Sequence, residues 1–150
     1  MKIGNVIKAL LVSFVVLVAG FTANVYLHEL GHWAVANHFG LNPQISTGSA
    51  ITGLAALDLT GGTPLIWTSY RGAGALNGQD ALIAFAGPAV NIAIAVIATL
   101  LYLAIPRRKR TPLVNLIFIM VLIPAVLSAV ANLIPIAPSD GWVIFSYLAR

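Results

Sequence analysis

Three long apolar stretches dominate this chain of 150 residues and limit what it can fold into. They cover about residues 6–37, 81–106 and 112–134, and each reaches the roughly 20 residues that an α-helix needs to cross a bilayer. Apolar residues make up 59% of the chain and charged residues 8%, against about 45–50% and about 25% in soluble domains. So few charges would not keep a small domain in aqueous solution. The sequence therefore predicts an all-α polytopic membrane protein with three transmembrane helices.

The segment between the first and second stretches has a different composition. Residues 40–78 hold eight of the 13 glycines, with β-prone pieces near 44–51 and 65–70. We expect a glycine-rich loop with a small β-hairpin, which is either an ordinary exterior loop or an edge strand that pairs with an extended substrate. The tail, residues 141–150, is too short to span and carries three aromatic residues, which indicates an interfacial helix. Residues 1–150 would then form a single membrane-embedded unit.

The basic residues are placed unevenly along the chain. Four of the eight form the run 107–110, between the second and third stretches, and Lys2 and Lys8 lie at the N-terminus. The positive-inside rule places these groups in the cytoplasm. No aromatic residue interrupts the run, so it indicates a membrane flank and not a nucleic-acid site. A cleaved signal peptide is the other interpretation of the N-terminus, but the apolar stretch continues past the small residues at 19–23, and these residues contain no clean A-x-A site.

A metal-binding pattern stands near the end of the first apolar stretch. Residues 28–32 read H-E-x-x-H. At about 100° per residue, His28 and His32 lie roughly 40° and one turn apart, so both imidazoles can reach one metal ion. Glu29 is placed to take a proton from water on the metal, and zinc lowers the pKa of such water toward about 7. The alternative is a chance motif that only ends the helix, but ionisable groups in a membrane helix are costly and usually functional.

A catalytic zinc centre needs a third protein ligand and one open position. Glu29 is the only glutamate, which excludes zinc enzymes with a downstream glutamate ligand. His38 stands six residues after His32. On a continuous helix its side chain points about 240° around the helix axis from that of His32, to the wrong side for a shared metal ion. Three aspartates remain. Asp80 is more simply the N-cap of the second stretch, and Asp58 lies in the glycine-rich loop. Asp140 follows the third stretch, at the end of the membrane where the first stretch also ends if all three cross.

These motifs occur in an order that resembles the site-2 protease family of intramembrane zinc metalloproteases (peptidase family M50). H-E-x-x-H at 28–32 is followed by A-G-P-x-x-N at 86–91 and by N-x-x-P-x-x-x-x-D-G at 132–141. Each lies on its own apolar stretch, and the resemblance covers about residues 20–142. It implies a three-helix core, one zinc ion with Asp140 as third ligand, and cleavage of peptide bonds at or within the membrane. It also suggests that Asn132 orients the substrate or stabilises the oxyanion.

The second motif has structural implications of its own. Gly87 and Pro88 are expected to let helices approach closely, and Asn91 is expected to form an interhelical hydrogen bond instead of acting in catalysis. Ser139 departs from the leucine that usually precedes the family's aspartate. The sequence shows no PDZ-like or CBS-like regulatory domain, so we expect a minimal form. The family's site usually lies nearer the cytosol, whereas the basic residues of this chain place its site toward the outer half of the membrane.

These features together predict a multi-pass protein of the cell membrane that is a zinc metalloendopeptidase. Its substrates would be membrane-associated or transmembrane peptide segments. Glu29 would activate the water and later protonate the leaving amine. Its surroundings would be the lipid bilayer and other membrane subunits, with no nucleic acid. One alternative is a non-catalytic relative that serves as a subunit of a larger membrane complex. A metal transporter is a weaker alternative, since a glutamate flanked by paired ligands suits hydrolysis better than ion release.

Overall fold

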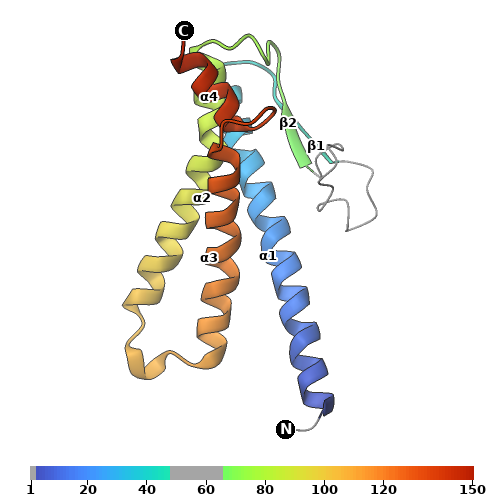
Figure 1. Cartoon of the computed structure of the whole chain (residues 1–150), viewed down its shortest axis with the longest axis vertical. Coiled ribbons are helices and arrows are strands. Elements are labelled where there is room, and N and C mark those ends of the chain that lie inside the picture. The colour runs from blue at the N-terminus through green and yellow to red at the C-terminus, as the bar shows by residue number, and fades with distance from the viewer. Residues whose placement is uncertain (1–2, 48–65) are drawn as a thin grey trace.

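The computed structural model describes residues 3–47 and 66–150, and its long helices follow the apolar stretches (Figure 1). The elements are α1 (Ile3–His38), α2 (Gly78–Ala104), α3 (Pro112–Leu133) and a short helix, α4 (Asp140–Leu148). Within the described residues, three helices are long and apolar enough to cross a membrane: Leu10–His38, Gly78–Ala104 and Pro112–Leu133. The predicted all-α fold with three membrane-length helices is therefore confirmed.

Capping interactions determine where the helices begin and end. At the start of α3, Thr111 Oγ1 accepts a hydrogen bond from the Val114 N–H at 3.3 Å, and Pro112 occupies the first turn, as expected. The helix α1 continues without a break through H-E-x-x-H. It ends before Gly40, whose φ of 70° lets the following N–H, that of Leu41, donate to the Ala36 carbonyl.

The start of α2 differs from the prediction, because Asp80 is not its N-cap. That position belongs to Asn77, whose side-chain oxygen accepts from the Asp80 N–H at 2.9 Å. Asp80 stands in the first turn, where its carboxylate accepts from the Leu76 N–H at 2.7 Å and from the Tyr70 hydroxyl at 2.9 Å. Asparagine caps as well as aspartate does, and a carboxylate is stabilised within the first turn by the helix dipole. Burial and the contact with Asp80 raise the pKa of Tyr70, which keeps its hydroxyl protonated.

The predicted hairpin is present as a two-stranded antiparallel sheet. It consists of β1 (Gln44–Thr47) and β2 (Ile66–Ser69), with Gln44 opposite Ser69. Residues 48–51 and 65 of the predicted strand pieces, and Asp58, lie outside the described residues, and Tyr70 follows the end of β2. The Thr68 hydroxyl donates to the backbone carbonyl of Glu29 at 2.9 Å. The hairpin is thus attached to the turn of α1 that carries H-E-x-x-H.

The side chains are distributed as expected for a protein in lipid, with apolar groups outside and polar groups inside. Large apolar residues are exposed on all three long helices, for example Phe14 at 65%, Leu101 at 65% and Leu127 at 63%. Among the described residues, the buried hydrophobic side chains are four alanines with Ile66 and Ile83. The buried polar ones are Asn24, His28, His32, Asp80 and Asn91. In a bilayer, polar groups are favoured only where protein surrounds them. Asn24, His28 and His32 are on α1, and Asp80 and Asn91 are on α2, which packs against both α1 and α3.

The two ends of the molecule carry different groups. The N-terminus of α1 and the turn between α2 and α3 lie at one end, and this turn contains a 3₁₀ helix over Arg107–Lys109 (Figure 1). Arg110 folds back over the turn. Its guanidinium lies 4.5 Å from the centre of the Tyr102 ring and donates to the carbonyls of Leu103 and Ile105. The hairpin and α4 lie at the other end.

Candidate metal centre

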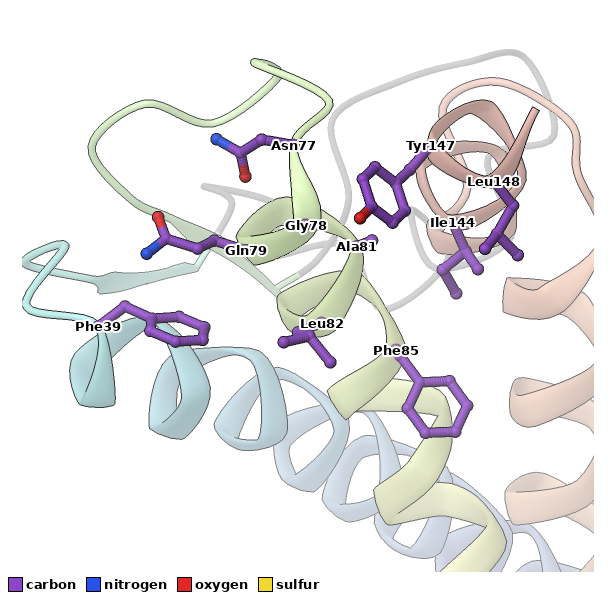
Figure 2. Close-up of a pocket in the computed structure, with 10 residues that line it drawn as sticks. All are labelled: Phe39, Asn77, Gly78, Gln79, Ala81, Leu82, Phe85, Ile144, Tyr147 and Leu148. Atoms are coloured by element: carbon purple, nitrogen blue, oxygen red, sulfur yellow. The ribbon is translucent and has the colours of Figure 1, made fainter. Parts of the chain in front are cut away.

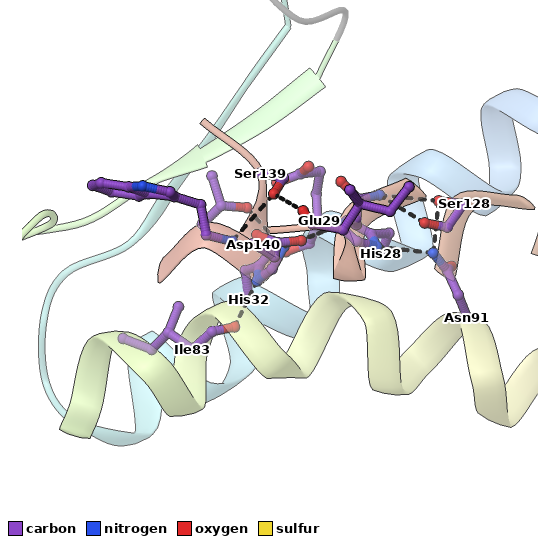
Figure 3. Close-up of polar contacts among 12 residues, drawn as sticks. His28, Glu29, His32, Ile83, Asn91, Ser128, Ser139 and Asp140 are labelled. Carbon is purple, nitrogen blue, oxygen red and sulfur yellow. Dashed lines mark hydrogen bonds and ion pairs between the residues drawn. The ribbon is translucent and has the colours of Figure 1, made fainter. Parts of the chain in front are cut away.

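Side chains from two distant parts of the chain meet at the hairpin end of the molecule (Figure 3). The last turns of α1 supply His28 and His32, and the first residue of α4 is Asp140. Asp140 Oδ2 lies 3.1 Å from His28 Nε2 and 3.5 Å from His32 Nε2. The two Nε2 atoms are 3.0 Å apart. The structure therefore brings together the three residues that the sequence suggests as ligands.

These separations fit three ligand atoms around one small metal ion. In a tetrahedral site with metal–ligand distances of about 2.0–2.1 Å, neighbouring ligand atoms lie about 3.3–3.4 Å apart. The three observed separations, 3.0, 3.1 and 3.5 Å, lie close to this value. Asp140 Oδ2 is also buried and accepts no well-directed hydrogen bond from the described residues. A buried carboxylate oxygen of this kind is satisfied by a cation.

Glu29 completes the group. Its carboxylate and the ring nitrogens of His28 and His32 lie within 4.8 Å of one another, so the three residues could hold a metal ion. Glu29 is half-buried, whereas the two histidines are almost completely buried. Because its backbone carbonyl is fixed by Thr68 of β2, the turn that carries Glu29 is held from the hairpin side.

The surroundings of Asp140 keep it anionic. Burial alone raises the pKa of this carboxyl group, but the contacts with His28 and His32 outweigh burial and hold the pKa below its ordinary value. A carboxylate must be deprotonated to bind a metal.

The turn before α4 explains how Asp140 reaches the histidines. Ser139 is the N-cap of α4, since its hydroxyl accepts from the Trp142 N–H at 3.2 Å and donates to the Ile134 carbonyl. These two contacts account for serine at this position. Gly141 lies within the first turn of α4, where an added Cβ would overlap the Leu133 carbonyl. The glycine is thus needed for close packing.

Gly87 of α2 forms the floor of the site. A Cβ at this position would overlap His32 Nε2 and would lie 2.6 Å from His28 Nε2. On the facing helix, a Cβ at Gly31 would lie 2.7 Å from the Ala86 carbonyl oxygen. The two helices therefore touch backbone to backbone at this level. The expectation that Gly87 permits a close helix approach is confirmed, and the approach places both imidazoles directly against α2.

The outer nitrogen of each imidazole contacts α2 as well. His32 Nδ1 lies 2.6 Å from the Ile83 carbonyl oxygen. His28 Nδ1 lies 2.9 Å from the side-chain amide of Asn91, which also contacts Ser128 Oγ at 2.7 Å. The predicted interhelical hydrogen bond of Asn91 is confirmed on both sides. Partners of this kind orient the ligating histidines of metal sites.

Asn132 lies one contact further from the histidines. Its amide donates to the Ser128 carbonyl at 3.0 Å and to Ser128 Oγ at 3.4 Å, so it reaches His28 only through Ser128 and Asn91. Its suggested role toward the substrate stays a prediction. Sequence reasoning missed Ser128, although a hydroxyl four residues before Asn132 in an apolar helix is a detectable signal.

The alternative ligands lie elsewhere. His38 is exposed at the end of α1, next to Phe39. Asp80 is occupied by the capping contacts of α2. Asp58 is outside the described residues. A hollow on the surface of α2 is also separate from the centre: it runs between Phe39 and α4 and is lined by apolar residues such as Leu82 and Phe85 (Figure 2).

The arrangement has the chemical parts of a hydrolytic metal centre. Two imidazole nitrogens and one carboxylate leave a tetrahedral ion with one open position, and a second carboxylate, Glu29, stands beside it. The chain matches none of the protein-family models, curated proteins or solved structures with which it was compared.

Proposed function

We propose that this chain is a zinc-dependent intramembrane endopeptidase of the site-2 protease type, which hydrolyses membrane-associated or transmembrane peptide segments. The observation that carries the proposal is the convergence of His28, His32 and Asp140 at one end of three apolar helices. Two imidazoles with one carboxylate suit zinc, which takes such ligand sets in hydrolytic enzymes. When bound, zinc acts as a Lewis acid that polarises the peptide carbonyl and activates water. The order of the three sequence motifs supports the same assignment.

Each residue of the centre then has a separate task. His28, His32 and Asp140 hold the ion, and the contacts from Ile83 and Asn91 keep the imidazoles in place. The Glu29 carboxylate takes the proton of the attacking water and delivers it to the nitrogen of the leaving amine. The burial of both histidines limits the access of bulk water, which strengthens electrostatic effects at the centre.

The first test is the metal content of the protein purified in detergent without chelators. We expect about one zinc per chain for the wild type and loss of zinc in Asp140→Ala, because two ligands alone bind weakly. His38→Ala is the matched control, since it removes a histidine outside the group. Zinc retained unchanged in Asp140→Ala would reject Asp140 as a ligand.

The second test is cleavage of a tagged single-span substrate in reconstituted vesicles. Glu29→Gln should keep its zinc and lose about 10²–10⁴-fold in rate, the usual contribution of a general base. Equal cleavage by Glu29→Gln would refute the proposed mechanism. If the wild type binds zinc, cleaves no substrate and co-purifies in a fixed ratio with other membrane proteins, it is the non-catalytic subunit of a larger complex.

A further inference from the structure

Asn91 is fully buried on α2 and connects α1 to α3 (Figure 3). One atom of its amide lies 2.9 Å from His28 Nδ1 and 2.7 Å from Ser128 Oγ. The other amide atom is buried and has no hydrogen-bond partner among the described residues. The oxygen and the nitrogen of an asparagine amide have nearly the same shape, so hydrogen bonding decides which of them faces a neighbour.

The two orientations of this amide require different forms of His28. If the nitrogen faces Nδ1, then Nδ1 accepts, and the ring proton lies on Nε2, 3.1 Å from Asp140 Oδ2. If the oxygen faces Nδ1, then Nδ1 donates, and Nε2 presents a lone pair toward Asp140. A neutral imidazole binds a metal only through its unprotonated nitrogen. Only the second orientation is therefore compatible with zinc on Nε2.

His32 differs from His28 in this respect. Its Nδ1 faces the Ile83 carbonyl at 2.6 Å, and a carbonyl only accepts hydrogen bonds. His32 is therefore held in the metal-binding tautomer by the backbone of α2. The tautomer of His28 depends on a side chain that can either donate or accept.

We propose that Asn91 is a positioning residue that selects the tautomer of His28 by turning its amide. In the metal-bound form its oxygen accepts from the Nδ1 proton of His28 and from the Ser128 hydroxyl; in the metal-free form its nitrogen donates to both. Either orientation leaves one amide atom without a partner, and without metal the proximity of the Nε2 proton to Asp140 Oδ2 favours the first orientation. Metal binding, which needs one orientation, then shifts the equilibrium. This inference rests on the proposed function, because it takes zinc as the ligand.

The first experiment measures zinc affinity by competition with a chromophoric chelator in detergent. Asn91→Ala removes the acceptor and should weaken binding by about 10–100-fold, as loss of an outer-shell partner does. Asn91→Asp keeps an acceptor in nearly the same shape and should restore most of the affinity. Asn24→Ala is the matched control, because Asn24 is also buried, lies one turn before His28 and makes no hydrogen bond to it in the described structure. Helix content by circular dichroism verifies that each variant is folded.

The second experiment reads the tautomer in the wild-type protein, so it does not depend on any variant folding. The chain has only three histidines, which makes the nitrogen NMR spectrum of ¹⁵N-histidine-labelled protein assignable. We expect the His28 proton on Nδ1 with zinc and on Nε2 after zinc removal, while His32 keeps its proton on Nδ1. A proton on the same nitrogen of His28 in both forms, or wild-type affinity in Asn91→Ala, would overturn the role of Asn91. Zinc binding that depends on Asn91 but brings no proteolysis would instead refute the proposed activity alone.

Discussion

Gly87 lies where the two imidazole rings leave no room for a side chain. An alanine there would place its methyl group against His28 Nε2 and His32 Nε2, the atoms that face Asp140. Neither ring can move away freely, since each outer nitrogen is fixed on α2. Even the single methyl group that Gly87→Ala adds would therefore collide with the ligand atoms of the candidate metal centre.

We expect Gly87→Ala to weaken zinc binding by at least the roughly 10–100-fold that loss of an outer-shell partner causes, and to destabilise the fold by about 1–3 kcal/mol through overpacking. Gly4→Ala is the control, because Gly4 is exposed and no described atom lies within 4 Å of its added Cβ. Chelator competition on both variants measures the difference. Wild-type affinity in Gly87→Ala would mean that the rings do not lie against α2 as described.

Some residues of the candidate metal centre can be predicted from the sequence, and others depend on how the helices pack. His28, Glu29 and His32 follow from spacing within one helix. Asp140 requires the further argument that the first and third helices end on the same side of the membrane, and the structure does bring it to the histidines. The contact of Gly87 with the two imidazoles and the contact of Ser128 with Asn91 depend on how α1, α2 and α3 pack. No periodicity within a single helix specifies that packing.

At the scale of elements, the apolar stretches predict that the helices exist, and local capping decides where they begin. The predicted start of α2 is late by three residues because Asn77 and Asp80 are both good candidates for the N-cap. Tertiary contact resolves the choice: the Tyr70 hydroxyl and the Leu76 N–H engage the Asp80 carboxylate, which leaves Asn77 to cap the helix. The hairpin is likewise predicted, but its attachment to Glu29 through Thr68 is visible only in the fold.

The division of tasks at the start of α2 can be tested by Asn77→Ala. This variant removes the side chain that accepts from the Asp80 N–H and should lower the free energy of unfolding by about 1 kcal/mol, the usual value for an N-cap. The loss stays moderate because Asp80 keeps its own contacts. Gln79→Ala, at an exposed position of the same turn, is the matched control. Titration with sodium dodecyl sulfate in mixed micelles measures both, and equal stability of the two variants would contradict the assignment.

At the scale of the whole molecule, most basic residues lie at the end of the N-terminus and the α2–α3 turn, while Arg71 and Arg150 lie at the hairpin end (Figure 1). The acidic residues of the described structure, Glu29, Asp80 and Asp140, all lie toward the hairpin end. The 3₁₀ turn Arg107–Lys109 lies at the opposite end, and its three side chains are exposed while Arg110 is engaged by the end of α2. Short loops rich in lysine and arginine remain in the cytoplasm during membrane insertion. This favours a cytoplasmic turn and a metal centre toward the outer half of the membrane.

This orientation is open to a direct test because the chain has no cysteine. Gly4→Cys marks the basic end and Ala75→Cys marks the hairpin end, and both positions are exposed. With a membrane-impermeant maleimide on intact cells, we expect labelling of Ala75→Cys, and labelling of Gly4→Cys only after permeabilisation. Replacing Arg107, Arg108 and Lys109 by glutamine should reduce this preference, since the charges of the turn set it. Labelling of Gly4→Cys alone would place the metal centre nearer the cytosol, where the site-2 protease resemblance places it, and would show that the basic turn does not determine how this protein inserts.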